Sequence, residues 1–373
     1  MAEPAAVLVA AVSGRALAAS ARRAGYLPLV TDFFGDHDTL SVAHEHVRLD
    51  GTLKRGIEAT TLLAALDRLT ARHHPIGIVY GTGFEDRPHL VQSLAQRWRV
   101  FGNAAATIAR IKDPESFASL CADADIPSPE VSSAKPKVAA DWLLKRRGGA
   151  GGVHIKQASQ GTHGRGETYY QRKVFGTPVS ALLLADGTSA GVLGFSAQWS
   201  LPTPRRPYRY GGAVRPAPLA PDAANKLTAA VERLAAMLKL VGLNSADFLV
   251  DGDSYWLLEV NPRPGATLDI FEPPEESLFA MHMAACAGTL SMQPTLRQGA
   301  EAAAIVYAEQ TIASFPALDW PHWTADRPVG GARIEAGGPL CTVYACSPTA
   351  AGARALAEQR RKMVLAWTRM GTS

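Results

Sequence analysis

The fold of this chain is decided by residues 247–265, DFLVDGDSYWLLEVNPRPG. Two apolar stretches flank Asp-Gly-Asp at 251–253, which predicts a hairpin because Gly tolerates positive φ and Asp bonds its own backbone. Asp247 is expected to begin the first strand. Glu259 and Asn261 stand two apart near the end of the second strand, so both side chains should point to one face of the sheet.

These three oxygen-bearing side chains predict a metal site. Hard cations such as Mg²⁺ take carboxylate and amide oxygens together with nucleotide phosphates. We therefore predict that Asp247, Glu259 and Asn261 bind Mg²⁺, with Mn²⁺ as an alternative metal. Arg263 follows on the same face, where a guanidinium can meet an anion. A solvated acidic turn is the simpler alternative for each residue alone, but the joint spacing favours a metal site.

A second group of residues is typical of phosphate binding. A predicted strand at 142–145 leads into RRGGAGGV at 146–153. Glycines let backbone N–H groups approach a phosphate closely, and a lysine adds a point charge. A flexible hairpin loop is the alternative for the glycines alone. The predicted phosphate ligands are Lys112, Lys145, Gly148, Gly149, Gly151 and Gly152.

The order of these elements resembles the ATP-grasp ligases over about residues 107–295. The resemblance implies that the nucleotide is ATP and that a strand at 168–176 bridges two lobes and contacts the adenine. Gln171 stands where this family usually has a glutamate; a glutamine keeps the hydrogen bonds but carries no charge. The candidate adenine contacts are Gln171, Arg172, Lys173 and Val174.

The chain is predicted to be an α/β protein, because strand and helix patterns alternate over residues 5–105, as in a parallel sheet covered by helices. In the ATP-grasp family such a domain helps to bind the acceptor or carboxylate substrate, which makes Glu85 a candidate by analogy. The expected domains are an N-terminal Rossmann-like domain (1–105), a smaller ATP-grasp lobe (106–175), a larger lobe with the metal site (176–300) and a C-terminal α/β cap (301–373).

Residues 202–216, PTPRRPYRYGGAVRP, form a predicted loop rich in Arg and Tyr. Alone, such a segment suits phosphates and stacked bases of RNA. The rest of the chain carries no basic field, so we expect no nucleic-acid partner. The resemblance instead places this loop where a basic residue meets the transferred phosphate and the substrate carboxylate. Arg209 and Arg215 are therefore candidate catalytic residues, together with Arg263.

Composition agrees with a globular protein of several domains: 373 residues, 47% hydrophobic and 19% charged, with a net charge of +4. None of the four cysteines forms a CxxC pair, so we expect neither a disulfide framework nor a structural zinc site, and a cytoplasmic location. No apolar run approaches the roughly 20 residues that span a bilayer, so no membrane partner is expected.

The resemblance implies an enzyme that activates a carboxylate as an acyl phosphate and joins it to an amine. DFFGD at 32–36, EVNPRP at 259–264 and the C-terminal module resemble a branch distantly related to biotin carboxylase and D-alanine–D-alanine ligase, and similar to tyramine–glutamate ligase of methanofuran synthesis. Glutamate with tyrosine or tyramine are the candidate substrates, for a one-carbon cofactor of the methylofuran type.

Two other functions stay open at this point. A carboxylating enzyme like biotin carboxylase would use bicarbonate and a biotin carrier, although the chain has no Met-Lys-Met biotin site. A regulatory protein could bind the nucleotide without turnover. The expected partners are a small-molecule carboxylate and amine, and the sequence leaves a homo-oligomer open.

Overall fold

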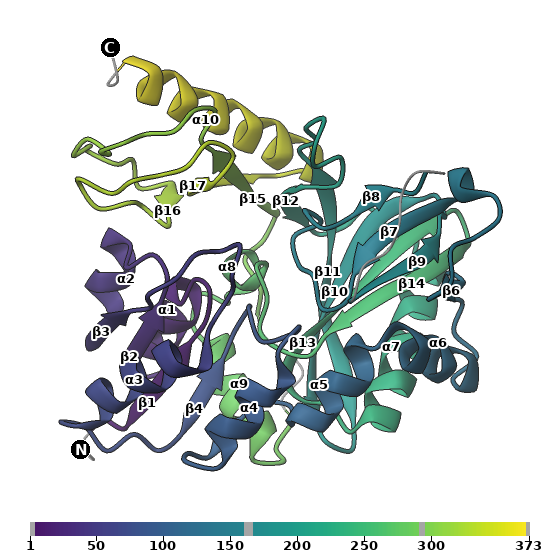
Figure 1. Cartoon of the computed structure of the whole chain (residues 1–373), viewed down its shortest axis with the longest axis horizontal. Coiled ribbons are helices and arrows are strands. Elements are labelled where there is room, and N and C mark those ends of the chain that lie inside the picture. The colour runs from purple at the N-terminus through teal and green to yellow at the C-terminus, as the bar shows by residue number, and fades with distance from the viewer. Residues whose placement is uncertain (1–3, 160–166, 291–294, 371–373) are drawn as a thin grey trace.

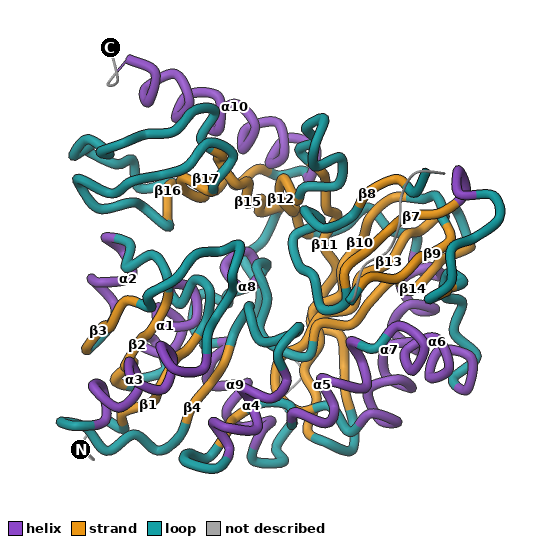
Figure 2. Tube along the Cα trace, viewed as in Figure 1, coloured by secondary structure: helices purple, strands orange, loops and turns teal. Residues whose placement is uncertain are grey.

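The computed structural model describes residues 4–159, 167–290 and 295–370. The strands form three sheets of five, eight and four strands. In Figure 1 the N-terminal sheet lies at the lower left, the C-terminal helix α10 at the top with β15, β16 and β17 below it, and the strands β6 to β11, β13 and β14 at the right. Figure 2 shows the long strands of the largest sheet running through the right half of the molecule. In the described ranges, the search for a membrane-crossing helix finds none.

The N-terminal sheet is parallel, with strand order β3-β2-β1-β4-β5. Asp32 ends β2, and its carboxylate accepts hydrogen bonds from the N–H groups of Gly14 (2.9 Å) and Gly35 (2.9 Å), which fixes the turn before the first helix. The elements are β1 (Ala6–Ala10), α1 (Arg15–Arg23), β2 (Leu27–Asp32), α2 (His37–Val42), β3 (Glu45–Arg48), α3 (Ala59–Thr70), β4 (Ile78–Tyr80), α4 (Pro88–Ala95) and β5 (Val100–Phe101).

The four-stranded sheet has the order β6-β9-β7-β8 and follows two short helices. Pro114 occupies the first turn of the second helix, where its missing N–H costs nothing, and Asp113 caps that helix by accepting the N–H of Ser116 (2.9 Å). The elements are α5 (Ala105–Lys112), α6 (Pro114–Asp123), β6 (Val131–Ser132), η1 (Ala139–Asp141), β7 (Trp142–Arg146), β8 (Lys156–Gln157) and β9 (Thr168–Arg172).

The largest sheet is antiparallel in the pairings from β14 to β16, with the order β14-β13-β10-β11-β12-β15-β17-β16. It continues across residue 300, because β15 pairs with β12. Its elements, with the helices between them, are β10 (Thr177–Asp186), β11 (Ala190–Ser200), β12 (Tyr210–Arg215), α7 (Pro221–Leu238), β13 (Val241–Asp251), β14 (Ser254–Asn261), α8 (Leu268–Phe271), α9 (Leu278–Cys286), β15 (Ala300–Tyr307), β16 (Thr324–Ala325), β17 (Pro339–Ser347) and α10 (Ala350–Met370).

Two sequence expectations about these strands were wrong. The predicted loop at 202–216 ends early, because Tyr210–Arg215 form β12 between two partner strands. Asp247 does not begin a strand. β13 extends back to Val241, because the long β10 provides backbone partners from Val250 to Val241. Asp247 is therefore held by a neighbouring strand on each side.

The two faces of the largest sheet pack against different partners. On one face, Leu183 and Phe248 join the apolar side of α7, including Leu234. On the other face, Leu182 and Leu243 share a core with α9 and with residues of the N-terminal sheet. Side chains alternate along β13, so Asp247 lies on the same face as Leu243, towards the N-terminal domain. The packing therefore places the predicted metal ligands between domains.

Candidate active site

The hairpin of β13 and β14 brings the predicted metal ligands together. Asp247 pairs directly with Glu259, and Ser245 with Asn261. The amide nitrogen of Asn261 lies 3.2 Å from Asp247 Oδ2 and 3.4 Å from Glu259 Oε1. The two strands thus present two carboxylates and one amide at a single point, as the spacing predicted.

Neighbouring strands add two polar contacts that the sequence did not predict. Ser180 on β10 donates a hydrogen bond to Asp247 Oδ1 (2.6 Å), and Gln198 on β11 approaches the same oxygen (3.4 Å). Only the strand order could have found them, because both are far from the hairpin in the sequence. They orient the Asp247 carboxylate from the side opposite Glu259.

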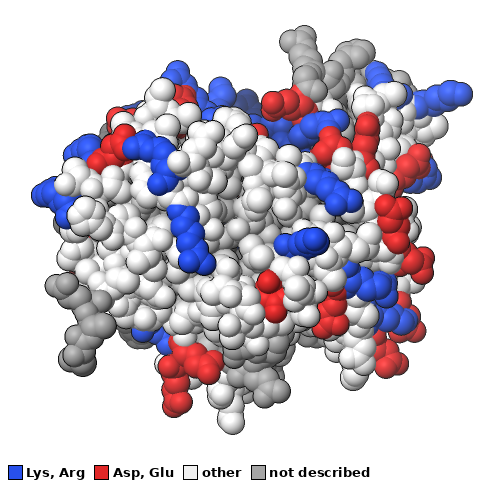
Figure 3. Space-filling model, turned by 90° about the horizontal axis from the view of Figure 1, so that it is seen from below, with Lys and Arg blue, Asp and Glu red and all other residues white. Residues whose placement is uncertain are grey.

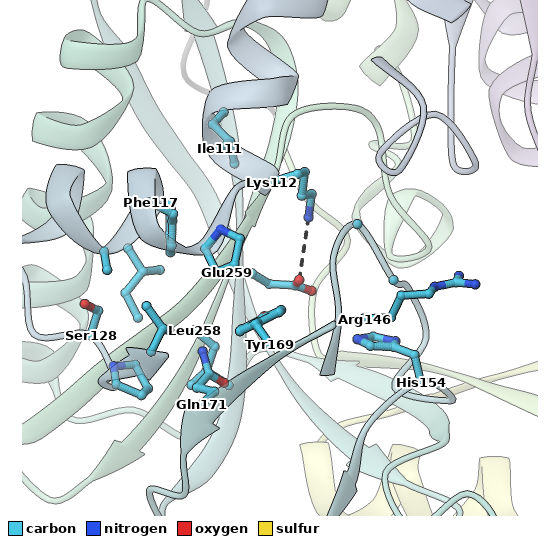
Figure 4. Close-up of a pocket in the computed structure, with 17 residues that line it drawn as sticks. Ile111, Lys112, Phe117, Ser128, Arg146, His154, Tyr169, Gln171, Leu258 and Glu259 are labelled. Carbon is cyan, nitrogen blue, oxygen red and sulfur yellow. Dashed lines mark ion pairs between the residues drawn. The ribbon is translucent and has the colours of Figure 1, made fainter. Parts of the chain in front are cut away.

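Lys112, at the end of α5, contacts two of the predicted metal ligands. Its Nζ donates to Asn261 Oδ1 (2.8 Å) and lies 3.5 Å from Glu259 Oε2, the ion pair drawn in Figure 4. Burial raises the pKa of Glu259, but Lys112, Lys145, His154 and a hydrogen bond with Asp247 together outweigh burial and hold that pKa below its ordinary value. Burial and then the Glu259 charge raise the pKa of Asp247. A second negative charge is thus unfavourable here without a further cation.

The donor set fits a hard divalent cation when the Asn261 amide is turned so that its oxygen, which here accepts from Lys112, faces the two carboxylates. Two carboxylates and an amide oxygen are typical Mg²⁺ ligands, and Mg²⁺ commonly fills its other positions with water and phosphate oxygens. Among the described residues no three His, Cys, Asp or Glu side chains come together as a metal site, so a cation here would depend on Asn261 and on such outside oxygens. The raised pKa of Asp247 is what a divalent cation would offset.

The glycine-rich loop between β7 and β8 lies against two other parts of the chain. Gly152 has φ of +70°, and a Cβ there would come within 1.9 Å of the Tyr208 carbonyl oxygen. Gly148 has φ of +61°, and a Cβ there would lie 2.4 Å from the Cα of Asp86. Only glycine fits these close approaches. The Gly151 carbonyl also accepts the N–H of Tyr210 (3.0 Å).

Lys145 precedes this loop on β7 and is buried. Its Nζ donates to Gln171 Oε1 at 3.1 Å. The glutamine that replaces the family's usual glutamate therefore binds the predicted phosphate lysine. Because the glutamine is neutral, it leaves the positive charge of Lys145 uncompensated within this pair.

A narrow cleft of about 30 Å³ lies between the four-stranded sheet and β14, too small as it stands to enclose a nucleotide. One end is apolar, with Ile111, Phe117 and Leu257, which suits a purine ring. The other end carries Lys112, Arg146 and the start of the glycine loop, which suits phosphates. Figure 4 shows Phe117 at one side of this cleft and Arg146 at the other, with Glu259 between them.

Of the four predicted adenine contacts, one lines the described cleft and three do not. Gln171 lines the cleft, as does Tyr169, which the sequence analysis did not single out. Arg172 is exposed and its guanidinium lies 3.7 Å from Glu130. Lys173 Nζ lies 5.2 Å from the centre of the exposed Phe175 ring. Lys173 and Val174 follow the end of β9 and are absent from the lining of the described cleft.

The three predicted arginines occupy different surroundings. Arg263 Nε lies 2.6 Å from Glu85 Oε1, and both side chains are buried. Burial raises the pKa of Glu85, but Arg263, Lys112 and backbone N–H groups together outweigh burial and hold that pKa below its ordinary value. The other Glu85 oxygen accepts the N–H of Gly83 (2.7 Å). Glu85 thus anchors Arg263, which was not foreseen.

The other two arginines are tied to the C-terminal part of the sheet. Arg215 is buried, with Nη2 3.0 Å from Glu301 Oε2. Arg209 stacks on the Tyr307 ring at 3.9 Å and donates to the Leu201 carbonyl (3.1 Å). These contacts hold β12 against β15. On the face seen in Figure 3, Lys and Arg stand interspersed with Asp and Glu, without a continuous basic field.

Comparison with known proteins now adds to this geometry. Residues 116–267 match the sequence family described as the ATP-grasp domain. The chain carries an ATP-grasp domain. The prediction of an ATP-grasp domain and of the α/β class of the fold is therefore confirmed. A search of curated proteins finds no match.

Solved structures share the fold of this ATP-grasp protein at low sequence identity. Pyruvate carboxylase from Rhizobium etli superposes with a TM-score of 0.73 at 15% identity, over 96% of this chain and 37% of its own. Biotin carboxylase from Campylobacter jejuni gives 0.71 at 14%, over 94% and 89%. The biotin carboxylase domain dimer of Hydrogenobacter thermophilus 2-oxoglutarate carboxylase, described with MgADP and bicarbonate, gives 0.71 at 14%, over 94% and 87%. This chain thus spans well under half of the first of these proteins.

Proposed function

We propose that this protein is an ATP- and Mg²⁺-dependent ligase that activates a carboxylate as an acyl phosphate and couples it to an amine. The observation that carries the proposal is the convergence of Asp247, Glu259 and Asn261 beside Lys112, at the edge of a cleft with an apolar and a cationic end. The ATP-grasp match of residues 116–267 supports ATP as the nucleotide.

In the proposed reaction a substrate carboxylate oxygen attacks the terminal phosphorus of ATP, the bond to the bridging oxygen breaks, and ADP leaves. An amine nitrogen then attacks the acyl carbon, loses a proton, and inorganic phosphate leaves. Bound Mg²⁺, or Mn²⁺, would supply positive charge that stabilises the transferring phosphoryl group. Asp247, Glu259 and Asn261 would hold that cation.

The chain's own residues have three roles in this proposal. Lys112 and Lys145 bind the phosphates, and Arg263, held in place by Glu85, binds the substrate carboxylate or the transferring phosphoryl group. The glycine loop, which already touches Tyr208 and Asp86, excludes water. Exclusion matters because an acyl phosphate hydrolyses readily. Arg209 and Arg215 are retained as candidates of a lesser rank, since both have partners within the sheet.

Glutamate with tyrosine or tyramine stay the proposed substrates, in the synthesis of a one-carbon cofactor. We propose a cytoplasmic location, which the free thiols of the four cysteines support. The Hydrogenobacter neighbour is described as a dimer. A homo-oligomer of this chain is a proposal that sedimentation tests directly.

The test is ADP release from Mg-ATP with a panel of carboxylates and amines, including glutamate with tyrosine or tyramine. We expect ADP release that requires both substrates, and a product whose mass equals their sum less one water. ADP release with either substrate alone and no adduct would contradict an amide ligase.

Carboxylation is the second candidate, favoured by the bicarbonate named for the Hydrogenobacter neighbour. It predicts ADP release that depends on bicarbonate and a biotin carrier, without an amine. ATP binding with no turnover on any pair would instead support a regulatory protein.

A further inference from the structure

His154 is a titratable side chain of the cleft to which the proposed reaction has so far given no role. It follows Gly152 by two residues and lines the cationic end of the cleft with Arg146, Gly148 and Glu259. Figure 4 shows its imidazole beneath Arg146, on the side that the glycine loop forms. The ring is therefore placed among the groups expected to meet phosphates.

The backbone of the loop is shaped around this ring. A Cβ on Gly149 would lie 2.4 Å from His154 Cγ and 2.5 Å from its Nδ1, closer than real contacts allow. Gly149 is not among the glycines with positive φ, so backbone strain does not explain it. The glycine at 149 lets the imidazole lie flat against the loop.

One ring nitrogen of His154 is left without a partner in the part of the chain that the structure describes. Its Nδ1 is buried, and no described residue makes a hydrogen bond with it. A buried polar atom without a partner costs free energy, so such an atom calls for an explanation. Burial first, and then Lys145, lower the pKa of His154 to about 4, so the ring is neutral near pH 7. A neutral imidazole can still donate one N–H.

We propose that His154 is a nucleotide-contacting residue whose Nδ1–H donates a hydrogen bond to a phosphate oxygen of ATP. This rests on the proposed function. A phosphate is the expected acceptor because His154 lies at the end of the cleft with Arg146 and Gly148, whereas Phe117 and Leu257 line the apolar end.

The test compares two substitutions that fill similar space. Asn at position 154 keeps a polar N–H donor near the place of Nδ1, and Leu keeps the bulk without a donor. We expect His154→Leu to raise the Kd for Mg-ATP about tenfold, and His154→Asn to raise it by about threefold or less. Adenosine, which has no phosphate, should bind both variants as it binds the wild type. His74→Leu, at an exposed histidine, is the matched control.

Each outcome decides between the proposals. Equal ATP affinity in the Leu variant and the wild type would overturn the role of His154 and leave the proposed function standing. A common loss in Leu and Asn variants that extends to adenosine would show a packing role and also overturn the inference. Failure of the wild type to bind ATP would overturn the proposed function and the inference together. Thermal unfolding of each variant shows whether the fold is kept.

A double-mutant cycle tests the same geometry without relying on Nδ1 alone. Gly149→Ala should weaken ATP binding in the wild type, because the new Cβ displaces the His154 ring. In the His154→Ala background the same change should have little further effect, since there is no ring to displace. Additive losses would mean that Gly149 acts independently of His154, and would count against the inference.

Discussion

Two clusters of charged side chains lie between domains, and they differ in how their charge is balanced. In the first, the Arg15 guanidinium binds Asp269 through both nitrogens of its fork (2.6 and 2.7 Å) and Asp326 through Nε (3.0 Å), and also donates to Tyr344 (2.9 Å). In the second, Asp247 and Glu259 face one another, with Lys112 3.5 Å from Glu259 and Lys145 also attracting its charge.

The difference separates a structural contact from a binding site. The Arg15 cluster joins α1 to α8 and to the segment after β16. Its carboxylates are paired with the Arg15 guanidinium or accept a backbone N–H. The metal-ligand cluster borders a cleft, its Glu259 side chain is 33% exposed, and its second carboxylate resists ionisation. We call the Arg15 cluster closed, because its charges are paired within the protein and stabilise the fold. We call the metal-ligand cluster open, because its charge is incompletely balanced beside a cleft and is available for a ligand.

The largest expected effect is on ATP turnover, from a substitution in the open metal-ligand cluster. Glu259→Gln removes one predicted metal ligand and the partner of Lys112, and should lower ATP turnover by about a thousandfold, since metal charge stabilisation contributes several kcal/mol. The thermal unfolding midpoint should change little, because the lost attraction to Lys112 and Lys145 offsets the removed like-charge contact with Asp247. Coupled ADP-release kinetics and calorimetry measure the two effects. Turnover near the wild-type rate would show that the metal assignment is wrong.

The next largest effect is on the free energy of unfolding, from a substitution in the closed Arg15 cluster. Arg15→Ala leaves Asp269 and Asp326 without their shared partner, and should lower the free energy of unfolding by about 3 kcal/mol. Turnover per folded molecule should stay within about twofold of the wild type, because Arg15 is outside the described cleft. Denaturant titration measures the loss. Arg22→Ala, on the exposed face of the same helix, is the control and should change stability little.

If Arg15→Ala instead removed activity without loss of stability, the contrast between the clusters would fail. The Arg15 group would then belong to the active site.

The last effect, which is the smallest for each pH unit, is a pH dependence beside the Arg15 cluster. Asp36 is buried near Asp326, Asp32 and Asp38, and burial and these charges raise its pKa to about 8. The folded state therefore holds a proton that the unfolded state releases near pH 4. The stability is present in full below about pH 4 and is lost as pH rises towards 8, by at most about 1.4 kcal/mol per pH unit.

Asp36→Asn should remove this slope, because an amide does not titrate. Unfolding free energies of the wild type and the variant, measured from pH 5 to 8, should converge at low pH and diverge at high pH, with the variant more stable. Asp50→Asn, at an exposed aspartate, provides the control. Parallel curves for wild type and Asp36→Asn would refute the pH dependence.

Local sequence was enough to predict the elements that carry the candidate site. The hairpin of β13 and β14 followed from a turn signal between two apolar strands, and the convergence of Glu259 and Asn261 followed from the two-residue period of a strand. The glycine loop followed from its composition. These features depend on neighbours in the sequence, so periodicity and turn chemistry determine them. The cytoplasmic location, the substrates and the domain boundaries stay predictions.

Only the tertiary structure decided which charges are open to a ligand. Arg263 with Glu85, Arg215 with Glu301 and Arg15 with Asp269 pair residues far apart in the chain, and no local pattern reveals such partners. Sequence alone ranked Arg209, Arg215 and Arg263 together, and gave no role to His154. Whether a charge is satisfied depends on packing between sheets, because burial removes the water that would otherwise solvate every charge equally.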